Sequence, residues 1–196
     1  FDLYDPDTSG TVSGFYYVYG MGKADWDMGD VSQYDTVDRN ILVAKIQKSD
    51  NSLVSTSDAL TITDNLTGSS NNIRRFTDAK VLTLSDGTQD ADAGRLTEKG
   101  KSYLFVSYEI DNFSTEQAKM NAYSIGTGGN PTTLSSPIEL TFQGGGGGNL
   151  SNIDSFGIVE RGGGEIVANI AAGGTIRSYD LTTSGSATGT NIDNVT

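Results

Sequence analysis

Apolar and polar side chains alternate in short runs along most of this chain, and Gly, Asn and Asp separate the runs. Alternation with a period of two indicates a half-buried β-strand, because successive side chains of a strand point to opposite faces. The pattern predicts an all-β fold with strands near 1–4, 15–20, 41–47, 59–63, 79–85, 102–110, 119–125, 138–142, 155–160, 165–170, 175–181 and 190–195. Helical turns are expected at most near 69–75 and 114–118.

The strands repeat in groups of four. Lys119-Met-Asn-Ala-Tyr-Ser-Ile125 aligns with Thr175-Ile-Arg-Ser-Tyr-Asp-Leu181, which places Tyr123 and Tyr179 in the same position. A hydrophobic strand precedes each of them, and a polar strand follows. We therefore expect a single all-β domain over 1–196, built from three four-stranded antiparallel meanders at 1–64, 78–142 and 153–195. An apolar inner strand and a polar outer strand are typical of a propeller blade.

Several segments resemble the blades of lactonase-like or YVTN-type β-propellers. They are Gly100-Lys-Ser-Tyr-Leu-Phe-Val106, Asn121-Ala-Tyr-Ser-Ile125, Glu165-Ile-Val-Ala-Asn-Ile170 and Gly174-Thr-Ile-Arg-Ser-Tyr-Asp-Leu181, with Tyr17-Val-Tyr-Gly20 as an echo of the tetrapeptide. The resemblance is best over 100–196 and implies a partial β-propeller, since three blades do not close a ring. Oligomerisation or a longer chain would complete it, and a β-sandwich is the alternative. No catalytic residues of that family match here.

The amino-acid composition limits the partners and the catalytic groups that are possible for this chain. The 196 residues carry a net charge of −12, which disfavours nucleic acid and anionic membrane surfaces as partners. Membrane insertion is not expected, because no apolar run approaches the ~20 residues needed to cross a bilayer. There is no Cys and no His, which excludes disulfides, thiol nucleophiles and a Ser-His-Asp triad. The chain starts with Phe1 and not with Met, so we expect it to be processed or to belong to a longer product.

The polar segment over 21–40 contains the candidate ligand-binding residues. It holds Asp25, Trp26, Asp27, Asp30 and Tyr34, and Trp26 is the single Trp of the chain. An exposed aromatic ring among carboxylates suits sugar stacking or cation capture. The ring offers an apolar face, while carboxylates accept hydroxyl hydrogens or bind hard cations. The alternative is structural: Trp26 fills a gap in the core and the aspartates keep a loop solvated.

A second candidate site is the segment from Asp5 to Ser13. Asp5, Asp7, Ser9 and Thr11 have the alternating spacing with which the first half of a calcium loop surrounds one ion, and Gly10 stands at the sharp turn. Tyr16 occupies the place of the usual bidentate Glu. Calcium is therefore the one cofactor expected, and a polar turn between two strands is the alternative.

These features favour a non-catalytic binding or structural module over an enzyme. We expect such a module on a cell or virion surface, as a homo-oligomer or part of a longer assembly, presenting loops to a carbohydrate or protein partner. The alternative is a propeller-type hydrolase or a carboxylate-based glycosidase. Its acids would come from the glutamates on or beside strands, which are Glu109, Glu116, Glu139, Glu160 and Glu165.

Overall fold

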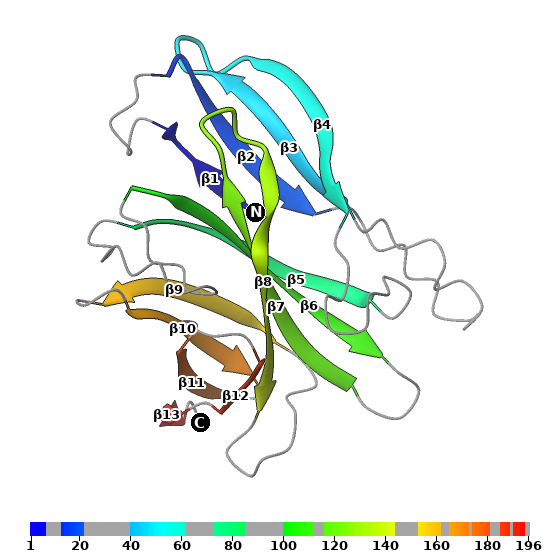
Figure 1. Ribbon diagram of the computed structural model, residues 1–196, viewed down its shortest axis with the longest axis vertical. Helices are drawn as coiled ribbons and strands as arrows, with labels where there is room; N and C mark the ends of the chain where they lie inside the picture. The colour runs from blue at the N-terminus through cyan, green and yellow to red at the C-terminus, as the bar shows by residue number, and fades with distance from the viewer. Residues whose placement is uncertain are drawn as a thin grey trace.

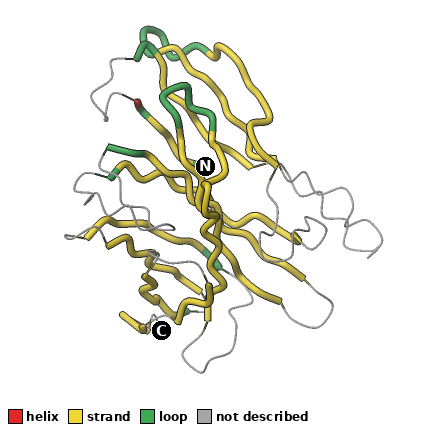
Figure 2. Tube along the Cα trace, in the orientation of Figure 1, coloured by secondary structure: helices red, strands yellow, loops and turns green. Residues whose placement is uncertain are grey.

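The protein is built from β-strands. The computed structural model describes residues 1–6, 13–21, 40–61, 73–84, 100–111, 116–143, 153–161, 165–172, 174–180, 185–188 and 190–194. Within these ranges the regular elements are thirteen β-strands, which form three sheets. Strands make up most of the described chain trace (Figure 2). The all-β class predicted from the alternating pattern is confirmed.

The first sheet is a four-stranded antiparallel meander. Its strands are β1 (Asp2–Tyr4), β2 (Phe15–Met21), β3 (Asn40–Gln47) and β4 (Leu53–Thr61), and they lie side by side in chain order (Figure 1). A tight turn over 48–52 joins β3 to β4. In this turn Asn51 has a φ of 57°, a left-handed conformation that Asn tolerates better than most residues.

The central and third sheets repeat this plan. The central sheet contains β5 (Ile73–Thr83), β6 (Ser102–Asp111), β7 (Glu116–Ile125) and β8 (Pro131–Gln143) in chain order, and β12 (Gly185–Thr188) pairs with β8 in parallel. The third sheet contains β9 (Ser155–Arg161), β10 (Glu165–Ala172), β11 (Thr175–Asp180) and β13 (Thr190–Asn194). The strands within each meander are antiparallel, as expected.

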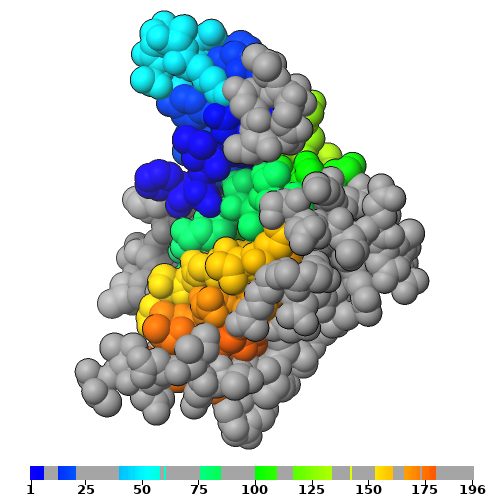
Figure 3. Space-filling view, turned by 90° about the vertical axis from the view of Figure 1, so that its left-hand side faces the viewer, coloured from blue at the N-terminus to red at the C-terminus, as the bar shows by residue number. Residues whose placement is uncertain are grey.

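The three sheets are stacked with the central sheet between the other two (Figures 1 and 3). One buried cluster joins the first sheet to the central sheet and includes Tyr19, Ile41, Val106 and Tyr108. A second cluster joins the other face of the central sheet to the third sheet. It includes Phe105, Met120, Phe142, Phe156, Ile166 and Tyr179.

Strand β6 lies at the centre of the stack and is buried on both faces. Residues 102–109 are all buried, with Leu104, Val106 and Tyr108 facing the first sheet and Phe105 facing the third. Its sequence, Ser-Tyr-Leu-Phe-Val-Ser-Tyr, is therefore a nearly continuous apolar run, which is the pattern of a strand covered on both sides.

The strand predictions were wrong in several places. β4 and β8 are longer than expected, because Leu53, Pro131 and their polar neighbours pair with β3 and β7 without a clear apolar alternation. β12 was missed, since Gly-Ser-Ala-Thr has no hydrophobic period. Residues 73–75 and 116–118, where helical turns were expected, belong to β5 and β7, because pairing with β6 supplies their backbone hydrogen bonds.

The turn between β7 and β8 fixes the central sheet against the first. Gly129 is buried in this turn with a φ of +77°, and its carbonyl oxygen accepts a hydrogen bond from the hydroxyl of Tyr19. A Cβ at Gly129 would overlap the ring of Tyr17. Position 129 therefore requires Gly for two reasons, the backbone conformation and the close contact.

A pair of glycine substitutions separates these reasons. Gly100 has a similar φ of +76° but open space around its Cβ position. We expect Gly100→Ala to cost about 1–2 kcal/mol from the left-handed backbone. Gly129→Ala should cost about 1–3 kcal/mol more, from overpacking against Tyr17. Urea unfolding of both variants tests this, and equal losses would show that the turn does not dock tightly on the first sheet.

Candidate functional site

The predicted ligand-binding residues Asp25, Trp26, Asp27, Asp30 and Tyr34 lie outside the described residues. The strand ends that bracket them are described. Met21 at the end of β2 pairs with Ile41, and Ile41 pairs with Leu60 near the end of β4. The segment 22–39 therefore leaves and re-enters the first sheet at the end where β4 also finishes. The prediction of a ligand site there stays a prediction.

Of the predicted calcium ligands, Asp5 is described, while Asp7, Ser9 and Thr11 lie outside the described residues. The carboxylate of Asp5 accepts a hydrogen bond from Lys48 Nζ at 2.6 Å, and this ion pair is partly exposed. In the part of the chain that the structure describes, no three Asp or Glu side chains gather as a metal site would require. A cation bound by Asp5 would have to compete with the Lys48 ammonium group.

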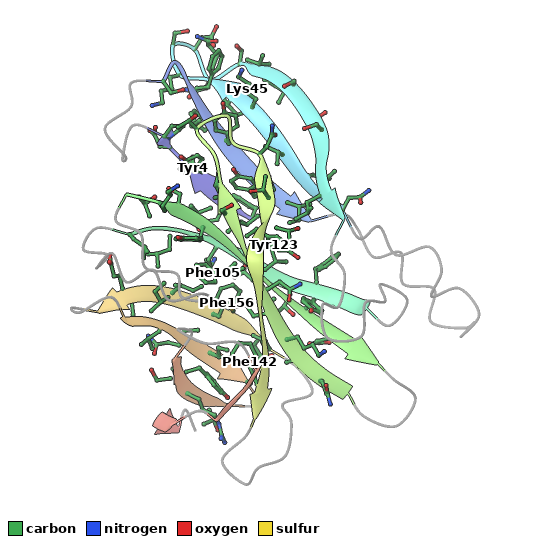
Figure 4. All side chains as sticks on the ribbon, in the orientation of Figure 1. Tyr4, Lys45, Phe105, Tyr123, Phe142 and Phe156 are labelled. Carbon is green, nitrogen blue, oxygen red and sulfur yellow. The ribbon has the colours of Figure 1, made fainter. Side chains whose placement is uncertain are left out.

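The structure brings together a set of tyrosines between the first and central sheets. Tyr4 and Tyr17 stack with their ring centroids 6.2 Å apart, and Tyr19 is fully buried beside them. Tyr123 enters the same cluster from β7 of the central sheet (Figure 4). These rings fill the interface with apolar surface, and their hydroxyls remain available for hydrogen bonds.

A buried hydrogen-bonded chain runs through the central-sheet side of this interface. The hydroxyl of Tyr108 donates to Asn121 Oδ1 at 3.0 Å, and Asn121 Nδ2 donates to the hydroxyl oxygen of Tyr123 at 3.0 Å. Asn121 is completely buried and Tyr123 is 3% exposed. A buried amide without partners would be costly, so these bonds make the polar residue compatible with the core.

Burial changes the acidity of the tyrosines. It raises the pKa of the Tyr19 hydroxyl far above the usual 10.0, and the neighbouring Tyr4 and Tyr17 add to the shift. Burial also raises the pKa of Tyr17, again with a smaller contribution from Tyr4. In the third sheet burial raises the pKa of Tyr179, and the guanidinium of Arg177 opposes the shift. The Tyr19 hydroxyl therefore remains a proton donor well into the alkaline range.

Carboxylates at the sheet interfaces bind backbone N–H groups and cations. Asp2 Oδ2 on β1 accepts a hydrogen bond from the N–H of Val81 on β5 at 2.7 Å, which links the first and central sheets. Asp78 lies 3.0 Å from Lys80 Nζ and 3.7 Å from the amino group of Phe1. Asp2 thus links β1 to β5, and Asp78 pairs with the residue that precedes β1.

Glu109 links the central and third sheets in the same way. Its side chain is 5% exposed, and Oε1 accepts a hydrogen bond from the N–H of Ile153 just before β9. Of the other glutamates considered for catalysis, Glu160 lies on β9 opposite Ile166. The side chains of Glu116, Glu139 and Glu165 lie outside the described part of the structure. The described contacts therefore give Glu109 a structural role.

Polar atoms without a hydrogen-bond partner occur at two described positions of the third sheet. Asn169 Oδ1 and Arg177 Nη1 are buried, and neither finds a partner among the described residues. They lie on opposite faces, because Asn169 pairs with Ser178 and Arg177 pairs with Ile170. The two groups therefore do not form one site.

Comparison with known proteins gives no relative. No protein-family model, no curated protein and no solved structure matches this chain. Among the described residues no helix is long and apolar enough to cross a membrane.

The interface network was not found by sequence reasoning. Asn121 and Glu109 stand on strands that were correctly predicted, but neither their burial nor their hydrogen-bond partners were predicted. The sequence does contain a usable signal. Strands β6 and β7 carry apolar residues on both of their faces, so a polar residue in either strand must be buried and hydrogen-bonded. Tyr123, which was singled out for its repeat position, does belong to the network.

Removing the Tyr19 hydroxyl should change how stability depends on pH. Because the pKa of Tyr19 is raised on folding, the unfolded chain loses its proton first as the pH rises. The contribution of Tyr19 is thus fully present below pH 10.0 and is lost progressively above it. We expect Tyr19→Phe to lose about 1–2 kcal/mol at neutral pH but to fall less steeply above pH 10.0 than the wild type.

Tyr16→Phe is the matched control, because the Tyr16 hydroxyl makes an exposed hydrogen bond to Asn51 Oδ1 at 3.2 Å. Chemical unfolding between neutral pH and pH 11 measures both variants. Equal alkaline slopes for Tyr19→Phe and the wild type would contradict the assignment.

The Asp5–Lys48 pair allows a direct test of the calcium prediction. If Asp5 is a calcium ligand, millimolar calcium should raise the melting temperature of the wild type and of Lys48→Met, but not of Asp5→Asn. If Asp5 only pairs with Lys48, both variants should lose less than about 1 kcal/mol, and calcium should have no effect on any of the proteins. Calorimetry with calcium and with magnesium distinguishes these outcomes.

Proposed function

We propose that this chain is a non-catalytic binding or structural module of stacked β-sheets, exposed on the surface of a cell or virion. Three meanders follow one another as blades of a partial, lactonase-like or YVTN-type propeller would. In support, the first strands β1, β5 and β9 lie in contact in series, β1 with β5 and β5 with β9. Each meander then proceeds outward strand by strand.

The observation that carries the proposal is the use of the polar groups between the sheets. Asp2 and Glu109 bind backbone N–H groups of the neighbouring sheet, and Asp78 pairs with the amino group of Phe1 next to β1. The buried tyrosine hydroxyls likewise bind Asn121 and the Gly129 carbonyl. Acids that catalyse glycoside hydrolysis face each other across a cleft, whereas these serve to hold the stack rigid.

A rigid stack suits the presentation of loops. The segment 22–39 with Trp26 starts and ends on strands β2 and β3, which pair over the whole of Phe15–Met21. Preorganised support of this kind lowers the entropy cost of binding. We propose that Asp25, Trp26, Asp27, Asp30 and Tyr34 bind a carbohydrate or a protein partner, with calcium stabilising the loop that begins at Asp5.

A propeller-type hydrolase or carboxylate-based glycosidase is the alternative function. It would use glutamates whose side chains lie outside the described residues, such as Glu116, Glu139 and Glu165. Release of reducing sugar from oligosaccharides would favour it, and the substitution that abolishes that activity would name the acid.

Trp26 makes the carbohydrate proposal directly measurable, since it is the single Trp of the chain. We expect its fluorescence to shift when a binding oligosaccharide from a neutral and acidic glycan panel is added. Trp26→Ala should lose at least tenfold in affinity on a glycan array, because ring stacking contributes much of such binding. Phe1→Ala, at an aromatic residue that is 86% exposed and outside this segment, is the control and should bind normally.

Failure of every glycan in the panel, with the protein folded, would overturn the carbohydrate form of the proposal. A protein partner is then tested by cross-linking from a photoreactive residue at position 26. If Phe1→Ala lost as much affinity as Trp26→Ala, the segment 22–39 would not be the specific binding site.

A further inference from the structure

Strands β12 and β13 complete two different sheets. β13 pairs with β11 in the third sheet, whereas β12, which precedes β13 in the sequence, pairs with β8 of the central sheet (Figure 1). The chain therefore leaves the third sheet after Asp180, runs along the edge of the central sheet over 185–188, and returns to the third sheet at Thr190. We call residues 185–194 the clasp, because they lie at the edges of both sheets.

Each strand of the clasp has one pairing partner. β12 stands at the end of the central sheet next to β8, and β13 stands at the end of the third sheet next to β11. Release of the clasp breaks these two pairings and leaves β5–β8 and β9–β11 paired as before. Segments with few contacts open at a lower free energy than the centre of a fold. The clasp therefore opens more easily than the strands that it covers.

The pairing of β12 with β8 is short. It joins Gly185–Thr188 to residues 140–143, and the two strands run parallel. Parallel pairing is slightly less stable per residue than antiparallel pairing. Phe142 of β8 is completely buried and packs against the ring of Tyr179, with 4.7 Å between the ring centroids. β8 is thus held in the core by contacts other than those of the clasp.

The pairing of β13 with β11 is interrupted. The register shifts between Ile176 and Arg177, so Ile192 has no counterpart on β11. A bulge of this kind disrupts the hydrogen-bond ladder locally and leaves one residue of the bulged strand unpaired. The second strand of the clasp is therefore also held by an imperfect ladder.

Arg177 adds a free-energy cost to the closed clasp. Its Nη1 atom is buried and has no hydrogen-bond partner among the described residues. A guanidinium stays charged in proteins, and a buried donor without an acceptor loses the hydrogen bonds that water would supply. Asn191 of the clasp stands opposite Arg177 in the register. Release of β13 admits water to this side of Arg177, so opening of the clasp relieves the cost.

We propose that the clasp exchanges between two copies of this chain, so that β12 and β13 of each copy pair with β8 and β11 of the other. The partner is a copy because the structure already holds this segment on these two edges, in a defined register. A clasp from a second copy makes the same pairings and needs no new contact. Exchange of an identical element is for this reason a low-cost route to a dimer.

The length of the link to the clasp limits the shape of the dimer. β11 ends at Asp180 and β12 begins at Gly185. An extended chain spans about 3.3–3.6 Å per residue, so this link reaches less than about 20 Å. The exchanging edges of the two copies must therefore lie side by side. Because the exchange is mutual, the product is a closed dimer and does not grow into a filament.

Thiol cross-linking in full-length chains tests the exchange, since the chain contains no Cys. Thr141 on β8 pairs with Ser186 on β12. Thr141→Cys and Ser186→Cys are made in separate chains, mixed at high micromolar concentration just below the onset of melting, cooled, and treated with bismaleimidoethane. The control is a mixture of Ser124→Cys and Thr132→Cys, which stand opposite each other in the β7–β8 pair and should not exchange.

We expect the Thr141→Cys and Ser186→Cys mixture to give at least tenfold more cross-linked heterodimer than the control mixture, and more than the homodimer of either variant. Size-exclusion chromatography should show a dimer and no larger species. No heterodimer from chains that circular dichroism shows to be folded would overturn the proposal. An equal yield from the control mixture would overturn it too, because the cross-link would then report collisions or global unfolding.

Hydrogen exchange read by mass spectrometry tests the opening step. Amides of the clasp should exchange before those of β10, and exchange of both together would overturn the proposal. Arg177→Met should slow clasp exchange and dimer formation at least threefold, because Met packs there without an unpaired donor. Lys101→Met removes the same charge at an exposed position and should leave both rates unchanged. Equal rates in Arg177→Met and the wild type would overturn the part assigned to Arg177. The exchange goes beyond the proposed ligand binding and is tested without any ligand.

Discussion

The central sheet is covered on both faces, and this constraint governs the rest of the molecule. Residues 102–109 of β6 are buried whatever direction their side chains point. The buried polar side chains of β6 and of its neighbour β7 then need partners inside the protein. Ser107 Oγ accepts from the N–H of Asp78, and Asn121 bridges Tyr108 and Tyr123. The first and third sheets pack on the two faces of the central sheet and so exclude water from both.

Tyrosine is well suited to such an interface. The ring of Tyr19 supplies as much apolar area as Phe would, while its hydroxyl reaches the Gly129 carbonyl of the adjoining sheet. A purely aliphatic contact would allow two sheets to slide along one another at small cost. A directional, buried hydrogen bond between the two sheets fixes one relative position. Aromatic packing thus holds the two sheets together, and the hydrogen bonds of the Tyr19 hydroxyl and the Asp2 carboxylate fix their relative position.

The sequence alone predicts the strands and their grouping well where one physical signal dominates. Alternation in 15–20 and the apolar run in 102–109 reflect burial directly, so β2 and β6 were located correctly. Tyr123 and Tyr179 aligned because equivalent strands of stacked meanders meet similar neighbours. β12 has no such signal, since Gly-Ser-Ala-Thr has no hydrophobic period, and it joins the central sheet by parallel pairing with β8. The roles of Asp2 and Glu109 depend on which residues of other sheets lie opposite, which no local pattern contains. The predicted ligand-binding and calcium-binding sites remain predictions. Asp5 is the one predicted site residue with a described contact, the ion pair with Lys48.

The parallel pairing of β12 with β8 has a consequence for how the chain acquires its structure. Hairpins such as β6–β7 and β9–β10 close short loops, and contacts of that kind form early. The outer strand of the central sheet instead comes from residues 185–188, after the first three strands of the third sheet have been made. During synthesis the outer edge of β8 therefore has no β12 to pair with until the first three strands of the third sheet have been made. An unpaired edge is the place where a nascent chain is most open to wrong strand partners, so correct assembly depends on how quickly a Gly-Ser-Ala-Thr segment arrives.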